Sequence, residues 1–287
     1  MIAAASIKLL RIPFSFFLAP LYFFTLSMVP NINWGNAALI FFILNILIYP
    51  ASNGYNSYMD RDTESIGGIE KPPPPPKQLF YLTIILDAVG VLLSLLISPV
   101  FAALMLVYIL ASKAYSYRGI RLKQYAIIGY LTVIIFQGAL TFCMVYYGTD
   151  AAGINTLPWQ GILICALLIG GFYPLTQVYQ HKQDVADGVK TISYRLGYTG
   201  TFIFCGSVYL VAWLLTAQFF IQQHSIGKLL SITVFFMPII LYFSWWFLQV
   251  KKDISAASFK NTMRMNWIAA TCTNTAFIIL LIWNHFE

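Results

Sequence analysis

The residues best suited to chemistry are gathered between Asn53 and Lys77. This stretch, NGYNSYMDRDTESIGGIEKPPPPPK, holds four of the chain's ten acidic residues and a run of consecutive prolines. Asn56, Asp60 and Glu64 are spaced four residues apart, so a helix that continued through them would place their oxygens on one face, about 6 Å apart along its axis. Such a row of oxygens at the end of an apolar helix could bind a divalent cation and a phosphate.

A second polar segment has the same character. Its sequence is GGFYPLTQVYQHKQDVADGVKTISYRLG, in which Gln177, Gln180 and Asp184 share a helix face, Asp187 follows one turn later and Gly188 ends the segment. If the fold brings the two segments together, hard oxygen ligands surround a magnesium site, namely Asn56, Asp60, Glu64, Gln180 and Asp184. Magnesium completes its coordination with water and phosphate oxygens, so a bound diphosphate would be activated as a leaving group.

Cations and tyrosines cluster in a third segment, SKAYSYRGIRLK, which carries Arg121, Lys123, Tyr115 and Tyr117. Guanidinium and ammonium groups beside phenols suit a phosphate clamp. The same charges are also explained by a bias of basic residues toward one membrane face. Lys71, just before the prolines, is most simply part of a solvated, rigid loop, and the alternative is a phosphate-reaching lysine on a stiff lid.

The elements that must position these residues are long apolar helices. Only 9% of the 287 residues are charged, and 59% are hydrophobic. A bilayer-spanning helix needs roughly 20 apolar residues, and such windows occur near 10–29, 36–57, 79–97, 99–114, 125–147, 159–178, 200–221, 228–249 and 265–284. We therefore predict an all-α, polytopic membrane protein with a nine-helix transmembrane bundle, folded as a single domain over 1–287.

Charge distribution predicts the orientation of this bundle. Every lysine and arginine except Lys228 falls on one side of a nine-helix arrangement, and that side is expected to be cytoplasmic. This topology accounts for the net charge of +7, so no nucleic-acid partner is expected. Two charged residues in apolar segments keep alternative interpretations. Arg11 is most simply a topogenic, snorkelling arginine, and Asp87 is either a functional carboxylate or one hydrogen-bonded within the bundle.

The combination of these features resembles the UbiA superfamily of intramembrane prenyltransferases over essentially the whole chain. NSYMDRDTE, residues 56–64, resembles the family's first aspartate-rich motif, and QHKQDVADGVKT, residues 180–191, resembles the second. AYSYRGIRLK, residues 114–123, is similar to the family's tyrosine and basic stretch.

The resemblance implies Mg²⁺-dependent transfer of a polyprenyl group from an allylic diphosphate to a lipophilic acceptor. The distribution of basic residues adds that the site faces the cytoplasm, and we expect the membrane to be a bacterial inner membrane. The resemblance also implies catalytic roles for Asp60, Asp184 and Tyr115. Diphosphate binding is implied for Lys71, Arg121, Lys123 and Tyr117, and metal binding for Asn56, Asp60, Glu64, Gln180 and Asp184.

The sequence departs from the family pattern at three motif positions. Ser57 and Gln180 stand where the family usually has aspartate, and Glu64 replaces the last aspartate of the first motif. These changes keep two alternatives to an aromatic, quinone-precursor-like acceptor open. One is a different acceptor, such as a glycerol phosphate ether lipid or a porphyrin-type propionate, and the other is a non-catalytic lipid-binding or transport protein that kept the fold.

Overall fold

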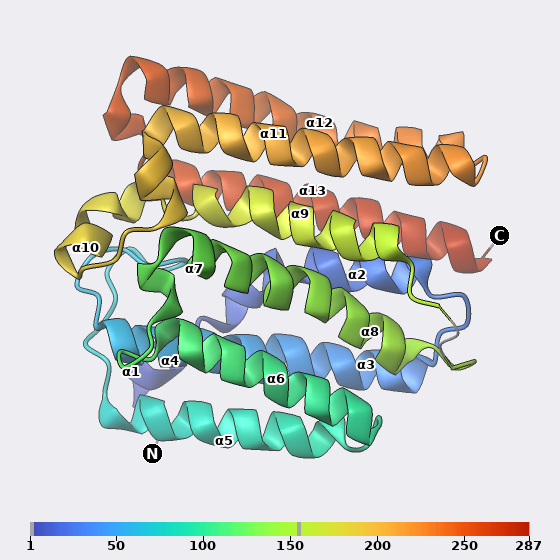
Figure 1. Ribbon diagram of the computed structural model, residues 1–287, viewed down its shortest axis with the longest axis horizontal. Coiled ribbons are helices and arrows are strands. Elements are labelled where there is room, and N and C mark those ends of the chain that lie inside the picture. The colour runs from blue at the N-terminus through green and yellow to red at the C-terminus, as the bar shows by residue number, and fades with distance from the viewer. Residues whose placement is uncertain (1–2, 154–155, 287) are drawn as a thin grey trace.

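The computed structural model describes residues 3–153 and 156–286, and this part of the chain is helical without a β-strand. Eight helices within it are long and apolar enough to cross a membrane, and a bent pair supplies a ninth span. All nine predicted spans are therefore present when the bent pair is counted as one span. Their helices run roughly side by side along the long axis of the molecule (Figure 1).

The bent pair is the first span. It comprises α1 (Ala4–Leu10) with η1 (Ile12–Phe17), followed at an angle of 41° by α2 (Ala19–Met28). Arg11 separates α1 from η1 in a left-handed conformation, with φ of 50°. Prolines in the first turn of η1 and of α2 then lack the N–H groups that would continue the preceding helix. The bend follows from this local chemistry and brings Arg11 toward the first acidic segment.

The second span runs from Trp34 to Asp60 and contains α3 (Trp34–Phe42), the π-helical η2 (Ile43–Ile48) and α4 (Tyr49–Asp60). After the proline run, α5 (Lys77–Ser94) and α6 (Pro99–Ser116) form an antiparallel pair. The fifth span is interrupted in the same way as the second, because α7 (Ala126–Val133) and α8 (Thr141–Thr149) flank the π-helical η4 (Ile134–Leu140). A short turn, η3 (Leu122–Gln124), precedes α7.

The second acidic segment follows α9 (Trp159–Leu175) as η5 (Val178–Gln180) and α10 (His181–Ala186). The remaining spans are α11 (Ile192–Gln222), which is kinked at Gly197, then α12 (Ile226–Lys252), the turn η6 (Ile254–Ala256) and α13 (Phe259–Phe286). The core between these helices is apolar, and the fully buried rings of Phe24, Phe142 and Phe277 pack where α2, α8 and α13 meet.

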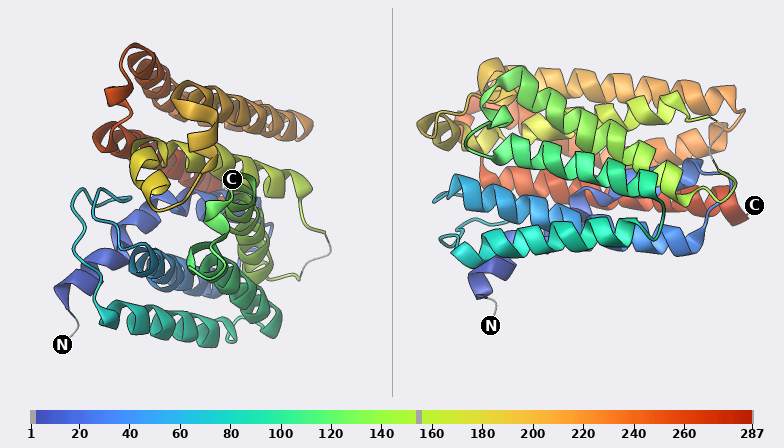
Figure 2. Two further views of the ribbon diagram at one scale, coloured as in Figure 1. Left: turned by 60° about the vertical axis from the view of Figure 1, so that its left-hand side comes forward. Right: turned by 60° about the horizontal axis from the view of Figure 1, so that its bottom comes forward.

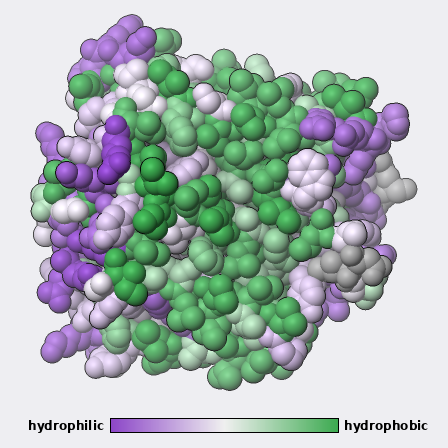
Figure 3. Space-filling model, in the orientation of Figure 1, coloured by the Kyte–Doolittle hydropathy of each residue, from purple (hydrophilic) through white to green (hydrophobic). Residues whose placement is uncertain are grey.

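The two ends of the bundle differ from its middle. On the face seen in Figure 3, hydrophobic residues cover the middle of the surface, and hydrophilic residues gather at the two ends. This is the surface of an integral, multi-pass membrane protein. The loops after α4, α6 and α9 lie at one end, together with α10, whereas the C-terminal end of α13 lies at the other (Figures 1 and 2). The three segments singled out for their chemistry are thus neighbours in space.

Candidate active site

Helix α4 ends at Asp60, and this end decides which acidic residues reach the interior. Arg61 adopts a left-handed conformation with φ of 55°, which terminates the helix. Asn53, Asn56 and Asp60 line a cavity of about 220 Å³, whereas Glu64 is exposed and does not line it. The expectation that Glu64 continues the helical row is therefore wrong. The row requires the helix to continue as far as Glu64, but α4 stops four residues earlier, at Asp60.

Asp62 lies in the cavity wall in place of Glu64. The turn at Arg61 redirects the chain so that the Asp62 carboxylate accepts a hydrogen bond of 2.5 Å from Nε2 of Gln183. Burial and the neighbouring Asp60 raise the pKa of Asp62 to about 6, against the opposing effect of Lys123 and Arg11. Sequence reasoning missed Asp62 because it lies outside the four-residue spacing.

The segment after α9 forms the facing wall. Gln177, Gln180 and Asp184 all line the same cavity, as their predicted common face requires. Nε2 of Gln180 also donates a hydrogen bond of 3.2 Å to the carbonyl oxygen of Ser65, so this wall is tied directly to the loop after α4. The structure therefore brings the two polar segments together around one cavity.

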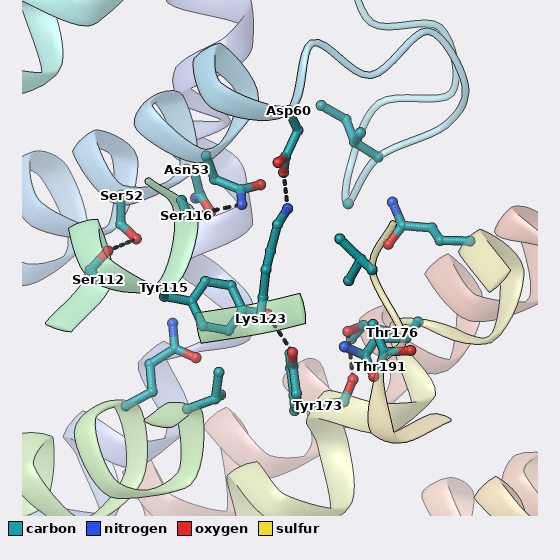
Figure 4. Close-up of a pocket in the computed structure, with 18 of the residues that line it drawn as sticks. Ser52, Asn53, Asp60, Ser112, Tyr115, Ser116, Lys123, Tyr173, Thr176 and Thr191 are labelled. Carbon is teal, nitrogen blue, oxygen red and sulfur yellow. Dashed lines mark hydrogen bonds and ion pairs between the residues drawn. The ribbon is translucent and has the colours of Figure 1, made fainter. Parts of the chain in front are cut away.

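The basic segment after α6 supplies the cations of the site. The ammonium group of Lys123 donates to Asp60 across the cavity, as Figure 4 shows. Arg121 lies behind this pair, 3.6 Å from Asp60, and it also forms an ion pair with Asp187. Both basic side chains are largely buried, with 10% exposed, and of the two only Lys123 lines the cavity.

The two tyrosines of this segment separate. The hydroxyl groups of Tyr115 and Tyr173 hydrogen bond to each other, and both residues line the cavity (Figure 4). Tyr117 is 48% exposed and lies outside the lining. Lys71 is likewise exposed and outside the lining. The structure thus places Tyr115 at the site but brings neither Tyr117 nor Lys71 to it.

Arg11 belongs to the site, which corrects its interpretation as a snorkelling residue. Its guanidinium group lines the cavity and donates to the carbonyl oxygens of Gly67, at 3.3 Å, and Asn53, at 3.1 Å. A Cβ atom at Gly67 would lie 2.7 Å from the Phe14 ring, so the loop can approach η1 closely only with glycine there. No sequence spacing indicated this contact, because it depends on the bend in the first span.

Two further residues have structural roles. Ser57, which replaces a family aspartate, is buried outside the cavity lining and donates to the carbonyl oxygen of Asn53 at 3.0 Å. The aspartate that the family usually has is thus replaced at a position that does not face the cavity. Asp87 forms a 2.6 Å ion pair with Lys113, whose ammonium group lies 4.0 Å from the centre of the Tyr55 ring. Asp87 is therefore paired within the bundle, and Lys113 does not line the cavity.

The cavity extends from this charged mouth into the bundle. Its inner wall is formed by aromatic, aliphatic and hydroxyl side chains of α6, α7, η4 and α9, among them Tyr108, Thr132, Val133, Phe136 and Phe172. One end thus offers acids, amides and cations, and the other offers apolar surface at membrane depth. An amphiphile with an anionic head and a hydrocarbon tail matches both parts.

The comparisons with known proteins agree with this geometry. The model of the UbiA prenyltransferase family matches residues 14–270, and the chain belongs to this family. No curated protein matches the chain.

Several solved structures share the fold. A UbiA homologue from Archaeoglobus fulgidus bound to DMAPP and Mg²⁺ is 18% identical, with a TM-score of 0.69 over 96% of this chain and 99% of that one. The apo form of a UbiA homologue from Aeropyrum pernix K1 is 17% identical, with a TM-score of 0.70 over 94% and 98%. A structure described for digeranylgeranylglyceryl phosphate synthase is 18% identical, with a TM-score of 0.61 over 97% and 98%.

Proposed function

We propose that this protein transfers a polyprenyl group from an allylic diphosphate to a lipophilic acceptor, with Mg²⁺ as its cofactor. The observation that carries the proposal is the single cavity that joins a mouth of acids, amides and cations to an apolar interior. The family to which the chain belongs supports it. So do the fold relatives from Archaeoglobus fulgidus, whose structures contain DMAPP or GPP together with Mg²⁺.

The residues at the charged mouth of the cavity have different roles according to their position. Asp60 and Asp184 approach the cavity from opposite walls, with the amides of Asn56 and Gln180 beside them, and these oxygens fit a hard cation such as Mg²⁺. Bound there, the ion neutralises charge that develops on a departing diphosphate. Lys123 supplies a further positive charge to the diphosphate oxygens, and Arg121 holds Asp60 and Asp187 in place.

Tyr115 has a different task, further inside. Its ring lines the cavity next to the charged mouth, and its hydroxyl group is fixed by Tyr173 (Figure 4). The face of an aromatic ring attracts positive charge. A ring fixed at this depth therefore suits stabilisation of the cationic carbon as its bond to diphosphate breaks. The acceptor, whether aromatic and quinone-precursor-like or another lipid, would enter from the apolar side.

The proposal includes a location. The end that carries the cavity mouth also carries the loops rich in lysine and arginine, whereas Lys228 lies near the start of α12 at the opposite end (Figure 1). By the bias of basic residues toward the cytoplasm, we place the site at the cytoplasmic face of a bacterial inner membrane. A water-soluble diphosphate head could reach the site from that side.

Membranes that contain the protein provide the test. Labelled geranylgeranyl diphosphate is supplied with Mg²⁺ and a lipid extract of the native host, and label in the lipid product is counted. Asp60→Ala and Asp184→Ala should each lower transfer by roughly 10²-fold or more, since each removes charge stabilisation from the reacting group. Glu70→Ala is the matched control, because Glu70 is an exposed acid outside the cavity. Transfer by Asp60→Ala and Asp184→Ala at the wild-type rate would reject the proposal.

A further inference from the structure

We propose that the end of the bundle opposite the cavity mouth carries a second binding site, which takes the phosphate headgroup of an anionic phospholipid. The site is a pocket of about 320 Å³ between the ends of α2, α11 and α13 and the start of α12. It lies at the end of the molecule where α13 finishes (Figure 1). The inference is independent of the proposed function, because none of the residues that line this pocket lines the cavity at the other end.

The charge of the pocket favours an anion. Lys228 and His285 line it, and among the described residues no aspartate or glutamate does. Lys228 is also the one basic residue that the sequence places on this side of the bundle, apart from the histidines. A concave wall that carries positive charge and no carboxylate attracts negatively charged groups. This pocket therefore differs from the first cavity, whose mouth combines acids with cations.

Lys228 is held in position without being neutralised. Its Nζ atom lies 5.9 Å from the centre of the Trp283 ring, and a cation–π contact of this kind orients the ammonium group but supplies no counter-charge. Within residues 3–153 and 156–286, Lys228 takes part in no ion pair. An ammonium group has three N–H donors, so Lys228 can donate to a phosphate that enters the pocket.

His285 offers a second donor. Its Nε2 atom is buried and has no hydrogen-bond partner in the described part of the chain. The ring is kept in place by Trp34, whose ring centre lies 6.1 Å away, and by the neighbouring Asn284, which donates a 2.6 Å hydrogen bond to the carbonyl oxygen of Ser27. A polar atom hidden from water without a partner is unfavourable. A phosphate oxygen would accept from this nitrogen in its protonated tautomer.

The surroundings favour a phospholipid over a free phosphate ion. Much of the pocket wall is apolar and is formed by side chains such as Met28, Val29, Phe219, Phe220 and Leu280. The same helix ends carry aliphatic side chains that are exposed on the outside of the bundle, namely Ile226 and Leu230 on α12 and Ile282 on α13.

Tryptophan marks the depth of the pocket. Trp34, which packs against His285, is itself exposed, and exposed tryptophans gather where the hydrocarbon of a membrane meets the headgroups. The pocket thus lies at headgroup level, next to apolar surface that acyl chains can cover. A free phosphate would use only the polar half of this site, whereas a phospholipid uses both halves.

Native mass spectrometry of the purified full-length protein tests the recognition of charge. Lipid-free protein in detergent is mixed with dioleoyl phosphatidylglycerol or with dioleoyl phosphatidylcholine, and bound lipid is counted. Wild type should bind one phosphatidylglycerol in preference to phosphatidylcholine. Lys228→Met and His285→Leu should each weaken that binding by about tenfold, since each removes a donor to the phosphate. His285→Gln keeps an N–H donor and should bind more tightly than His285→Leu.

Lys252→Met is the matched control, because Lys252 is an exposed lysine at the other end of α12. It should bind phosphatidylglycerol as wild type does. Equal binding of the two lipids by wild type, or unchanged binding of phosphatidylglycerol in both Lys228→Met and His285→Leu, would overturn the proposal.

Scanning fluorimetry separates the lipid headgroup from a free anion. A ligand that binds the folded state raises the melting temperature, so phosphatidylglycerol should raise that of wild type and leave that of Lys228→Met nearly unchanged. Inorganic phosphate should have no more effect than potassium chloride of the same ionic strength. An equal rise with inorganic phosphate, or an equal rise in wild type and Lys228→Met, would overturn the assignment. Neither measurement depends on prenyl transfer.

Discussion

At the scale of single residues, one backbone conformation decides the composition of the site. Arg61 ends α4 with φ of 55°, and this exchanges Glu64 for Asp62 in the cavity wall. The four-residue spacing predicted Asn56 and Asp60 at the cavity but could not reveal the end of the helix, because arginine has no strong preference for a left-handed conformation. The departures from the family pattern at Ser57 and Glu64 concern positions that the structure places away from the cavity.

The first prediction compares the two acids directly. Asp62→Ala should lower Mg²⁺-dependent prenyl transfer by roughly 10²-fold, because it removes a carboxylate of the cavity wall that can hold the Mg²⁺ ion. Glu64→Ala should leave transfer within about twofold of wild type, since an exposed carboxylate outside the cavity has little effect. Initial rates of label transfer in membranes measure both. The reverse order of effects would show that the helix end is wrongly placed.

The second prediction concerns the metal-free protein and pH. The pKa of the buried Asp62 carboxyl is about 6, compared with an ordinary value of 3.8. Because the pKa of Asp62 is higher in the folded protein than in the unfolded chain, ionisation of Asp62 lowers the free energy of unfolding. This cost in stability develops as pH rises from about 4 to 6 and is constant above pH 6. At pH 7.5 the cost is about 3 kcal/mol, and at pH 5 it is roughly half of that.

Asp62→Asn removes the ionisable group and keeps an oxygen that Gln183 can donate to. In EDTA it should therefore melt at a higher temperature than wild type at pH 7.5, and the difference should shrink at pH 5. Scanning fluorimetry in detergent measures the melting temperatures. A difference that does not depend on pH would contradict the assigned pKa.

At the scale of elements, pairs of helices are joined by polar contacts inside an apolar bundle. Sequence windows predicted every span, because long apolar runs are a strong signal. They could not show the bend in the first span or the pairing of Asp87 with Lys113, since both depend on which helices become neighbours. For the same reason Arg11, which is far from the acidic segments in sequence, was not expected at the cavity.

The third prediction tests the contact between α5 and α6. Asp87→Ala leaves the Lys113 ammonium group without its partner at 2.6 Å, and loss of one member of a buried pair costs about 3–5 kcal/mol. Thermal unfolding in detergent should show this loss. The double substitution Asp87→Leu with Lys113→Met removes both charges and should recover most of the stability. Equal destabilisation by the single and the double variant would show that the pair is not the cause.

The fourth prediction tests the contact between the first span and the loop after α4. Arg11→Met removes the donors to the carbonyl oxygens of Gly67 and Asn53 while keeping an apolar stem. The loop should then protect its amides less in hydrogen exchange, and the Michaelis constant for the prenyl diphosphate should rise severalfold. Lys252→Met, an exposed basic residue at the end of α12, is the control. Unchanged exchange in the segment 61–70 would contradict this role for Arg11.

At the scale of the whole molecule, the proposed orientation rests on the distribution of basic residues. The fifth prediction uses single cysteines that react with a membrane-impermeant maleimide, in a variant whose four native cysteines are replaced by alanine. Glu70→Cys, at the end with the cavity mouth, should react in inside-out vesicles. Gln223→Cys, at the other end, should react in right-side-out vesicles. Both positions are exposed. The opposite pattern would place the site outside the cell.

We expect binding of a prenyl diphosphate to this bundle to depend on Mg²⁺, and calorimetry measures that dependence. Purified full-length protein is titrated with geranylgeranyl diphosphate in the presence of Mg²⁺, and again in EDTA. We predict saturable binding with Mg²⁺, and at least tenfold weaker binding both in EDTA and in Asp184→Asn with Mg²⁺. Binding of equal strength with and without Mg²⁺, or no binding in either case, would rule out a Mg²⁺-dependent site for a prenyl diphosphate in this bundle.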